Sequence, residues 1–272
     1  MNKVEKMLRL LCAVGCAVVV LTACGGGGSS SSVAAPSSGG ATTGDSTTGR
    51  AGSLARFALA ADVLYTISGA NLKLFDVSDA SSPKSSVVVR IASDIETLFV
   101  KGDYLFVGAR NGMYIYDNKL AGFPSYVSQF VHTRSCDPVV VAGNYAYVTL
   151  RGGTRCGGFT NELEIIDIQD LYTPTLVANF PMSAPQGLGL MGDKLYVCDT
   201  AGLRTFAKKD APLLTELSVR SDIICNDLIP TDSTLIATSS GVVAQYMQRD
   251  DALTKVSAIS ETTPTAQAAA AN

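Results

Sequence analysis

A six-residue pattern recurs five times along this chain and limits its possible folds more than any other feature. Its clear copies are Gly102-Asp-Tyr-Leu-Phe-Val107, Gly143-Asn-Tyr-Ala-Tyr-Val148 and Gly192-Asp-Lys-Leu-Tyr-Val197, and weaker copies begin at Ala61 and Thr231. The starts are separated by 41, 41, 49 and 39 residues. Self-similarity at such a period is typical of repeat architectures, in which each repeat is one supersecondary unit.

Three further elements accompany each copy of the pattern. A short apolar segment precedes it, and a run such as Leu163-Glu-Ile-Ile-Asp-Ile168 or Leu72-Lys-Leu-Phe-Asp-Val77 follows it. The last element begins with proline in four of the five units, at Pro83, Pro124, Pro174 and Pro212. Short Val/Ile/Leu/Tyr runs broken by Gly, Asp, Asn and Pro indicate strands. Each unit is therefore predicted to form four strands in about 41 residues.

Repeated four-stranded units of this length are typical of a β-propeller. A single four-stranded sheet cannot bury both of its faces, but neighbouring blades cover each other. The predicted fold class is all-β, a β-propeller of five four-stranded blades over residues 53–260. Six or seven blades would need a further 40 to 80 residues, so an incomplete ring or a pairing partner is the alternative.

The third unit carries a resemblance to a known family. Its elements Gly-Asn-Tyr-Ala-Tyr-Val, Leu-Glu-Ile-Ile-Asp-Ile and Pro-Thr-Leu-Val resemble the LVIVD repeat of exported bacterial proteins. The resemblance covers roughly residues 55–260 and is weakest in the fifth unit. It implies a propeller, and it implies almost nothing about function because the family is largely uncharacterised.

The N-terminus reads as a bacterial lipoprotein signal. Basic Lys3, Lys6 and Arg9 precede the apolar run of residues 10–21, which is too short for a transmembrane helix. Leu21-Thr-Ala-Cys24 resembles the lipobox, in which the cysteine becomes the lipidated first residue of the mature protein. An ordinary cleaved signal or a chance cysteine is the alternative. The prediction is a signal peptide over residues 1–23 and lipid attachment at Cys24.

The Gly/Ser-rich stretch after Cys24 is predicted to be a flexible tether. Residues 24–52 contain little that could be buried, and residues 261–272 are predicted to be a flexible tail. Acyl chains on Cys24 would hold the domain on a bilayer. The expected location is the cell envelope, with lipid anchoring, on either the periplasmic or the surface side. Gly25 stands where Asp would argue for inner-membrane retention, so the outer membrane is favoured in a Gram-negative cell.

Four cysteines remain after the signal and the anchor are set aside. They are Cys136, Cys156, Cys198 and Cys225. In an exported protein, an even number of cysteines suggests disulfides. If strands a to d run from the centre of each blade to its rim, all four fall at the end with the b–c and d–a connections, here called the top face. The favoured pairs are Cys136–Cys156 and Cys198–Cys225, while other pairings and reduced, buried cysteines are alternatives. No Cys-x-x-Cys spacing occurs, and no metal site is predicted.

The top face is where we expect a partner to bind. The third unit is longer than the others because its b–c connection, residues 151–161, contains an insertion rich in glycine. Loops on a rigid scaffold commonly carry binding. Solvated loop residues are the simpler interpretation for most of the polar candidates. The predicted binding-face residues are Asp94, Glu96, His132, Arg134, Asp137, Arg151, Arg155, Phe159, Asp222 and Asp227.

Composition narrows the possible functions further. The net charge of −3 excludes the basic field that nucleic-acid binding needs. His132 is the only histidine, and no nucleophile-elbow, phosphate-binding or dinucleotide motif occurs, so no catalytic residue and no cofactor are predicted. The expected function is a lipid-anchored, non-catalytic binding or interaction scaffold that takes an unknown protein or glycan on its top face. An assembly accessory of the envelope is a second possibility. The enzymatic alternative is a glycan-directed envelope hydrolase that uses top-face carboxylates.

Overall fold

The structure is a computed structural model, and it describes residues 52–91, 94–120, 123–132, 138–153, 157–249 and 251–260. All of these residues belong to one compact unit, Thr43–Asn272. The predicted signal peptide, Cys24 and the predicted tail lie outside the described residues, as does the predicted tether except for its last residue. Within the described ranges, no helix has the length and hydropathy needed to cross a membrane.

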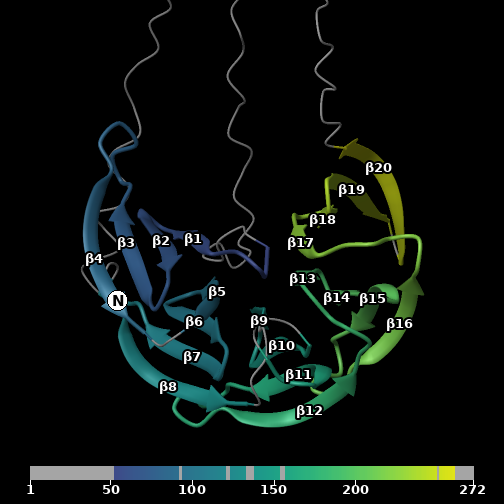
Figure 1. The fold of residues 1–272 in the computed structure, drawn as a ribbon, viewed down its shortest axis with the longest axis horizontal. Helices are drawn as coiled ribbons and strands as arrows, with labels where there is room; N and C mark the ends of the chain where they lie inside the picture. Colours follow the sequence, from purple (N-terminus) through teal and green to yellow (C-terminus); the bar gives the residue numbers. More distant parts are fainter. Residues whose placement is uncertain are drawn as a thin grey trace, which may run out of the picture. The chain divides into compact units, whose positions relative to one another are not determined.

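The described residues form five antiparallel four-stranded sheets, here called blades 1 to 5, in which strand order follows chain order. Figure 1 shows the blades following one another around a common centre, from β1–β4 in purple and blue to β17–β20 in yellow. The predicted five-bladed propeller is therefore confirmed. The strands are β1 Phe57–Ala60, β2 Val63–Ser68, β3 Asn71–Asp76 and β4 Lys84–Arg90; β5 Ile95–Lys101, β6 Tyr104–Ala109, β7 Gly112–Asp117 and β8 Ser125–Val131; β9 Val139–Ala142, β10 Tyr145–Arg151, β11 Asn161–Asp167 and β12 Thr175–Pro181; β13 Leu188–Met191, β14 Lys194–Asp199, β15 Gly202–Ala207 and β16 Thr215–Arg220; β17 Asp227–Pro230, β18 Thr234–Ser239, β19 Val242–Arg249 and β20 Ala252–Ser260.

Turn chemistry explains why the six-residue pattern starts with glycine. Gly102, Gly143 and Gly192 stand in the turns between the first two strands of their blades, with φ of 54°, 55° and 58°. Glycine adopts this left-handed conformation without steric cost. Blade 1 has Ala61 at the same place with φ of 48°, so a side chain there occupies a backbone region that it disfavours.

The last strand of every blade carries the same irregularity. Its pairing with the third strand contains a register shift in all five sheets. A bulge adds local twist to a strand. The last strand of each blade is also more exposed to solvent than the other three, because it lies at the edge of its sheet and no further strand pairs with it. This recurring bulge accompanies the proline that opens the fourth element in four of the units.

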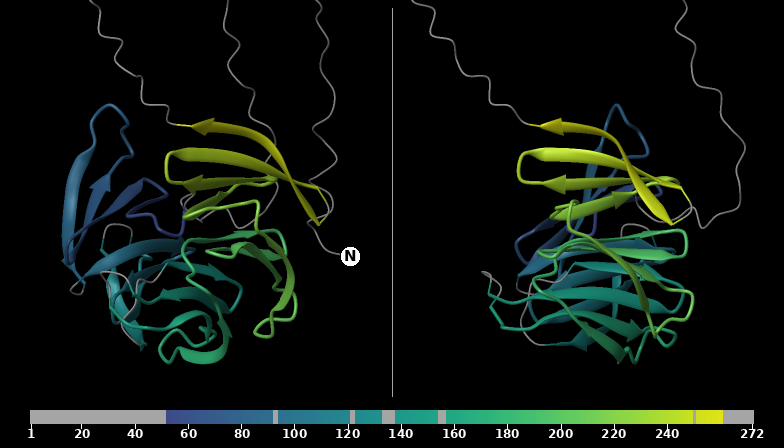
Figure 2. Two further views of the ribbon diagram at one scale, coloured as in Figure 1. Left: turned by 45° about the vertical axis from the view of Figure 1, so that its right-hand side comes forward. Right: turned by 90° about the vertical axis from the view of Figure 1, so that its right-hand side faces the viewer.

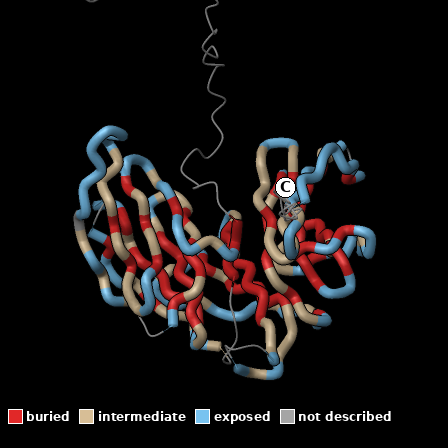
Figure 3. The backbone as a smooth tube through the Cα atoms, turned by 45° about the horizontal axis from the view of Figure 1, so that its top comes forward, coloured by how far each residue is buried: buried red, intermediate tan, exposed pale blue. Residues whose placement is uncertain are grey.

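The core lies between blades. The innermost strands β1, β5, β9, β13 and β17 are neighbours in that order. Leu72 and Leu74 of blade 1, for example, are buried against Leu98 and Leu105 of blade 2. The middle strands of blades 2, 3 and 4 are buried on both sides, as the red segments of Figure 3 indicate.

The two terminal blades are each covered on one side only. Strands β2 and β18 alternate between buried and partly exposed residues, whereas β6, β10 and β14 are buried almost throughout. In the left view of Figure 2, the first sheet (blue) and the last sheet (yellow) stand apart from each other. The described residues therefore form an open ring, in which packing of blade 5 on blade 1 does not complete the circle.

Candidate binding face

The top face is the end of the blades where the b–c and d–a connections lie. Because the strands of each blade are antiparallel and in chain order, the connections β4–β5, β8–β9, β10–β11, β12–β13 and β16–β17 all fall at this end. Each predicted binding-face residue that the structure describes belongs to one of these connections or to a strand end beside it. Arg134, Cys136, Asp137, Arg155 and Cys156 lie outside the described residues, so their placement remains a prediction.

The insertion of blade 3 presents an aromatic side chain to solvent. Phe159 is 97% exposed, the largest exposure among the exposed large hydrophobic residues described. The Gly153 amide donates to the Gly158 carbonyl at 3.0 Å, and the Gly152 amide donates to Asn161 Oδ1 at 3.1 Å. These bonds hold the two ends of the loop together. An apolar ring held outward in this way is available to another molecule.

Arg151 stands at the base of the same loop. It is the last residue of β10, opposite Asn161 in the ladder, and it is partly exposed. The loop that carries Phe159 thus begins directly after Arg151. That these two residues bind a partner stays a prediction.

Asp94 and Glu96 are brought together by one arginine. Arg110 Nη1 lies 3.4 Å from Asp94 Oδ2, and Arg110 Nε lies 3.9 Å from Glu96 Oε1. Burial raises the pKa of Glu96, and the nearby charge of Arg110 opposes that rise. The two carboxylates are thus parts of an ion-pair cluster on blade 2, which leaves them less available to a ligand or a reaction.

His132 lies beside an acidic residue that the sequence analysis did not single out. Glu164, on β11 of blade 3, is only 5% exposed. Burial raises the pKa of Glu164 to about 6, while the positive charge of His132 lowers it and the negative charge of Glu162 raises it. Glu164 Oε2 makes no hydrogen bond. Nothing in the sequence indicated this burial, since Glu162 and Glu164 alternate around Leu163 as solvent-facing residues of a strand do.

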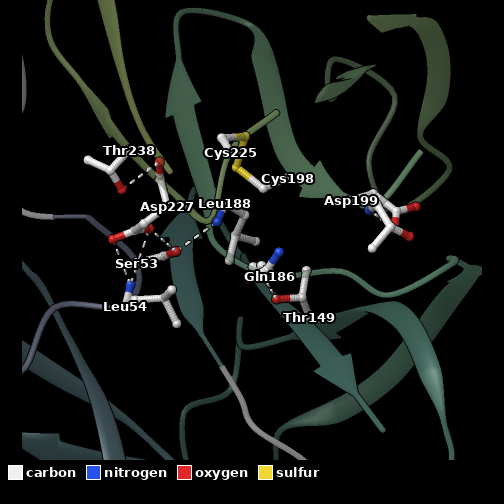
Figure 4. Close-up of a disulfide and its surroundings, with 11 residues drawn as sticks. Ser53, Leu54, Thr149, Gln186, Leu188, Cys198, Asp199, Cys225, Asp227 and Thr238 are labelled. Carbon is white, nitrogen blue, oxygen red and sulfur yellow. Dashed lines mark hydrogen bonds between the residues drawn. A yellow bond between two sulfur atoms is a disulfide. The ribbon is translucent and has the colours of Figure 1, made fainter. Parts of the chain in front are cut away.

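Asp227 binds the residues that precede β1. Its carboxylate accepts a hydrogen bond from Ser53 Oγ at 3.1 Å and bonds from the Leu54 amide at 3.3 and 3.4 Å (Figure 4). Ser53 Oγ in turn accepts a bond from the Leu188 amide at 2.7 Å. Residues 52–55, here called the clasp, therefore connect blade 5 to blade 4 ahead of β1. The sequence offered no signal for this role of Asp227.

The clasp is closely packed and reaches blade 2 as well. A Cβ atom on Gly52 would overlap Asp227 Oδ2, and one on Gly187 would lie 2.6 Å from Asp227 Cα. The Leu98 amide donates to the Ala55 carbonyl at 3.1 Å. Burial raises the pKa of Asp227, and the hydrogen bonds that it accepts oppose this rise. Asp227 is thus held inside the ring rather than presented to a ligand.

The disulfide predicted between blades 4 and 5 is present. Cys198 of β14 and Cys225, just before β17, are joined by a bond of 2.03 Å with their Cα atoms 5.4 Å apart (Figure 4). The second predicted pair, Cys136–Cys156, lies outside the described residues. The bond and the clasp flank the same blade junction, which is the last one in the ring.

The remaining described carboxylates of this face are also paired. Asp222 accepts two bonds from Arg220 at 2.7 Å, which lower its pKa. Asp199 accepts the amides of Ser183, Ala184 and Thr200 and lies 3.6 Å from Arg204. Among the described residues, no group of three His, Cys, Asp or Glu side chains is placed to hold a metal ion.

The five sheets define the protein as a β-propeller, and comparison with protein families adds the type of repeat. Residues 90–117 and 133–181 match the LVIVD repeat model. The chain therefore contains LVIVD repeats, in the second and third of its five units. No functionally curated protein matches the chain significantly.

Solved structures support the fold. A Bacteroides fragilis protein provisionally named a 6-phosphogluconolactonase aligns with a TM-score of 0.61 and 13% identity, over 75% of this chain and 69% of that one. A periplasmic gluconolactonase of Pseudomonas aeruginosa gives a TM-score of 0.57 and 15% identity, over 73% and 67%. Apo AztD of Citrobacter koseri gives 0.54 and 12%, over 74% of this chain and 60% of AztD. The chain thus spans about three fifths of the length of AztD. At these identities the likeness concerns the fold alone.

Proposed function

We propose that this protein is an exported lipoprotein, anchored in a cell-envelope membrane through lipid on Cys24, whose propeller binds a protein or glycan without catalysis. In a Gram-negative cell the membrane would be the outer membrane. Phe159 is the observation that carries the binding part of the proposal. An aromatic ring that is 97% exposed on a glycine loop gains most from burial against a partner.

The contacts that the described top-face carboxylates make within the protein favour a binding function over hydrolysis. A glycosidase needs two carboxyl groups that converge on one bond with divided acid and base roles. The described carboxylates of Asp94, Glu96, Asp222 and Asp227 each interact with a cation, a hydroxyl or a backbone amide of the protein itself. Each of these carboxylates therefore already has a partner within the protein itself.

The first experiment removes the loop and asks what is lost. Residues 152–159 are deleted in the full chain together with a Cys136→Ser substitution, since the deletion takes away Cys156. Because the loop is an insertion at the end of two strands, we expect the thermal unfolding transition to be retained and co-purification of an envelope partner from detergent extracts to disappear. Retention of the partner by the deletion variant would count against this binding site.

A matched pair of point variants sharpens the comparison. Phe159→Ala removes the exposed ring of the top face, while Phe123→Ala removes a ring that is 65% exposed in the β7–β8 connection at the opposite end. Only the first variant should weaken co-purification. Equal losses in both variants would point to general stickiness of exposed aromatic residues.

The enzymatic alternative is assayed in parallel. Two of the fold neighbours have names that refer to gluconolactones, so the substrate panel contains sugar lactones as well as envelope glycans. Turnover that disappears in an Asp137→Asn or Glu96→Gln variant with retained folding would replace the scaffold with a hydrolase. We expect no turnover above that of a heat-inactivated sample.

A further inference from the structure

A surface pocket of about 400 Å³ lies on blade 3, at the end of the blades opposite the top face. This end carries the a–b and c–d connections and is here called the bottom face. The end of β11, the start of β12 and the connection between these strands form the pocket, and its size lies within the range of ligand pockets. The lining residues are all polar: Asp167, Gln169, Asp170, Thr173 and Thr175.

Two carboxylates give the pocket a negative charge. The Tyr172 amide and the Thr173 hydroxyl donate to Asp170 at 2.9 and 2.8 Å. These bonds hold the pKa of Asp170 below its usual value, so its carboxylate is charged in neutral solution. None of the ion pairs between described residues involves Asp170 or Asp167. The pocket is therefore an acidic site that the described part of the chain does not neutralise.

Blade 2 shows which cation an equivalent aspartate holds. Asp117 is the last residue of β7, as Asp167 is the last residue of β11. Oδ1 of Asp117 accepts the Lys119 amide at 2.8 Å, and in blade 3 the Gln169 amide makes the equivalent bond at the same distance. Lys119 Nζ then lies 3.2 Å from Asp117 Oδ2 and 5.5 Å from the centre of the Tyr104 ring. A lysine ammonium is thus held between an aspartate and a tyrosine.

Blade 3 has the aspartate and the tyrosine of this arrangement but lacks the lysine. The ladder pairs Tyr145 with Asp167, which is the counterpart of the tyrosine–aspartate pair of blade 2. The residue at the place of the lysine is Gln169, and its neutral amide cannot balance the charge of a carboxylate. Asp167 Oδ2 therefore offers to another molecule the position that a lysine ammonium occupies in blade 2.

The surroundings of the pocket suit a basic protein segment. Tyr172, in the same connection, is 76% exposed and offers its ring to a cationic side chain. Asp76 and Asp117 end the third strands of blades 1 and 2, and Asp62 and Asp103 stand in the first turns of those blades. On the bottom face, the described carboxylates outnumber the described cations. This field attracts a segment that carries several positive charges.

We propose that the pocket between β11 and β12 binds a lysine side chain from a basic segment of a partner protein, with the ammonium on Asp167 and beside Asp170. The site lies at the other end of the blades from the top face, and it does not depend on the binding proposed there. One exposed ion pair changes an affinity by about fivefold at most. The segment should therefore contain several lysines, and its binding should weaken as the salt concentration rises.

The test titrates fluorescein-labelled octalysine with the full chain in nonionic detergent at low salt and measures fluorescence anisotropy. Asp167→Asn removes the charge and keeps an oxygen for the Gln169 amide, while Gln169→Lys supplies blade 3 with the lysine that blade 2 has. Both variants should bind octalysine about fivefold more weakly than the wild type. Asp117→Asn is the control, because it changes the net charge by the same amount at a carboxylate that already holds Lys119; it should bind like the wild type.

Equal weakening by Asp117→Asn and Asp167→Asn would overturn the proposal, because the acidic face would then attract cations without a site, and so would a wild type that does not bind octalysine. Displacement of octalysine by spermidine at equal amine concentration would assign the pocket to a small polyamine and contradict a protein-borne lysine. Carbodiimide coupling followed by mass spectrometry locates the contact: an amide between octalysine and Asp167 or Asp170 supports the proposal, whereas coupling only to other carboxylates contradicts it. Unchanged circular dichroism and thermal transitions ensure that each variant is folded.

Discussion

Substituting Glu164 with Gln is expected to stabilise the protein at neutral and alkaline pH and to change little in acid. Glu164 is buried at the junction of blades 2 and 3, and its Oε2 lacks a hydrogen bond. Burial disfavours the charged carboxylate, which is why its pKa is raised. Glutamine keeps the shape of the side chain and cannot ionise.

The size of the effect follows from the pKa. The Glu164 carboxyl has a pKa of about 6 in the folded protein against 4.5 for an unperturbed Glu. A shift of one unit corresponds to about 1.4 kcal/mol, so ionisation of Glu164 costs the folded state about 2 kcal/mol when the pH exceeds both values. Below the unfolded pKa both states are protonated and no penalty exists. The penalty develops as the pH rises from the unfolded pKa of 4.5 towards the folded pKa of about 6 and stays constant above it, and the charges of His132 and Glu162 contribute to that folded pKa.

The assay is denaturant unfolding of the wild type and of Glu164→Gln from about pH 4.5 to about pH 8. The variant should gain about 2 kcal/mol in unfolding free energy at the alkaline end and almost nothing at the acid end. Asp210→Asn, at an exposed loop position, serves as the control and should show no such difference. A Glu164→Gln variant that loses stability at alkaline pH would refute the reasoning, because it would mean that the buried charge is favourably paired.

Three further predictions concern the last junction and the first turn. The double substitution Cys198→Ser with Cys225→Ser should lower the unfolding free energy by about 2–4 kcal/mol in denaturant titrations, and an unchanged midpoint would mean that the bond does not constrain the unfolded chain. Asp227→Ala removes the acceptor of the clasp and should cost about 1–3 kcal/mol, with faster amide hydrogen exchange at Leu54; unaltered exchange would contradict the clasp. Ala61→Gly should raise the thermal midpoint by relieving a left-handed alanine worth about 1 kcal/mol, and a lower midpoint would argue against that backbone conformation.

The repeat allowed the architecture to be predicted because its information is redundant. Five copies specify turn, strand length and register again and again, so that errors in one weak copy, such as the one at Thr231, do not matter. Glycine at a left-handed turn and proline at the start of an outer strand are local requirements of the backbone, and they are legible from the residues themselves. The Cys198–Cys225 pair was predictable for the same reason, since the repeat register places both cysteines at one end of adjacent blades.

The clasp could not be predicted because it depends on contacts between distant parts of the chain. Ser53 and Asp227 are separated by 174 residues, and neither has a sequence context that suggests a partner. The burial of Glu164 could not be predicted either, because Glu162 and Glu164 alternate around Leu163 as solvent-facing residues of a strand do, and only the packing of the blades covers Glu164. The exposed sides of blades 1 and 5 depend on whether the ring closes, and strand patterns that repeat from blade to blade do not reveal that.

Photocrosslinking from position 159 tests the binding proposal most directly. A photoreactive phenylalanine analogue replaces Phe159 in the full chain, expressed in cells, and the same analogue replaces Phe123 as the control at the other end of the blades. The scaffold account predicts one dominant crosslinked protein or glycan conjugate from position 159 and none of it from position 123. Absence of any conjugate specific to position 159, in cells where the protein is folded and membrane-associated, would contradict the account.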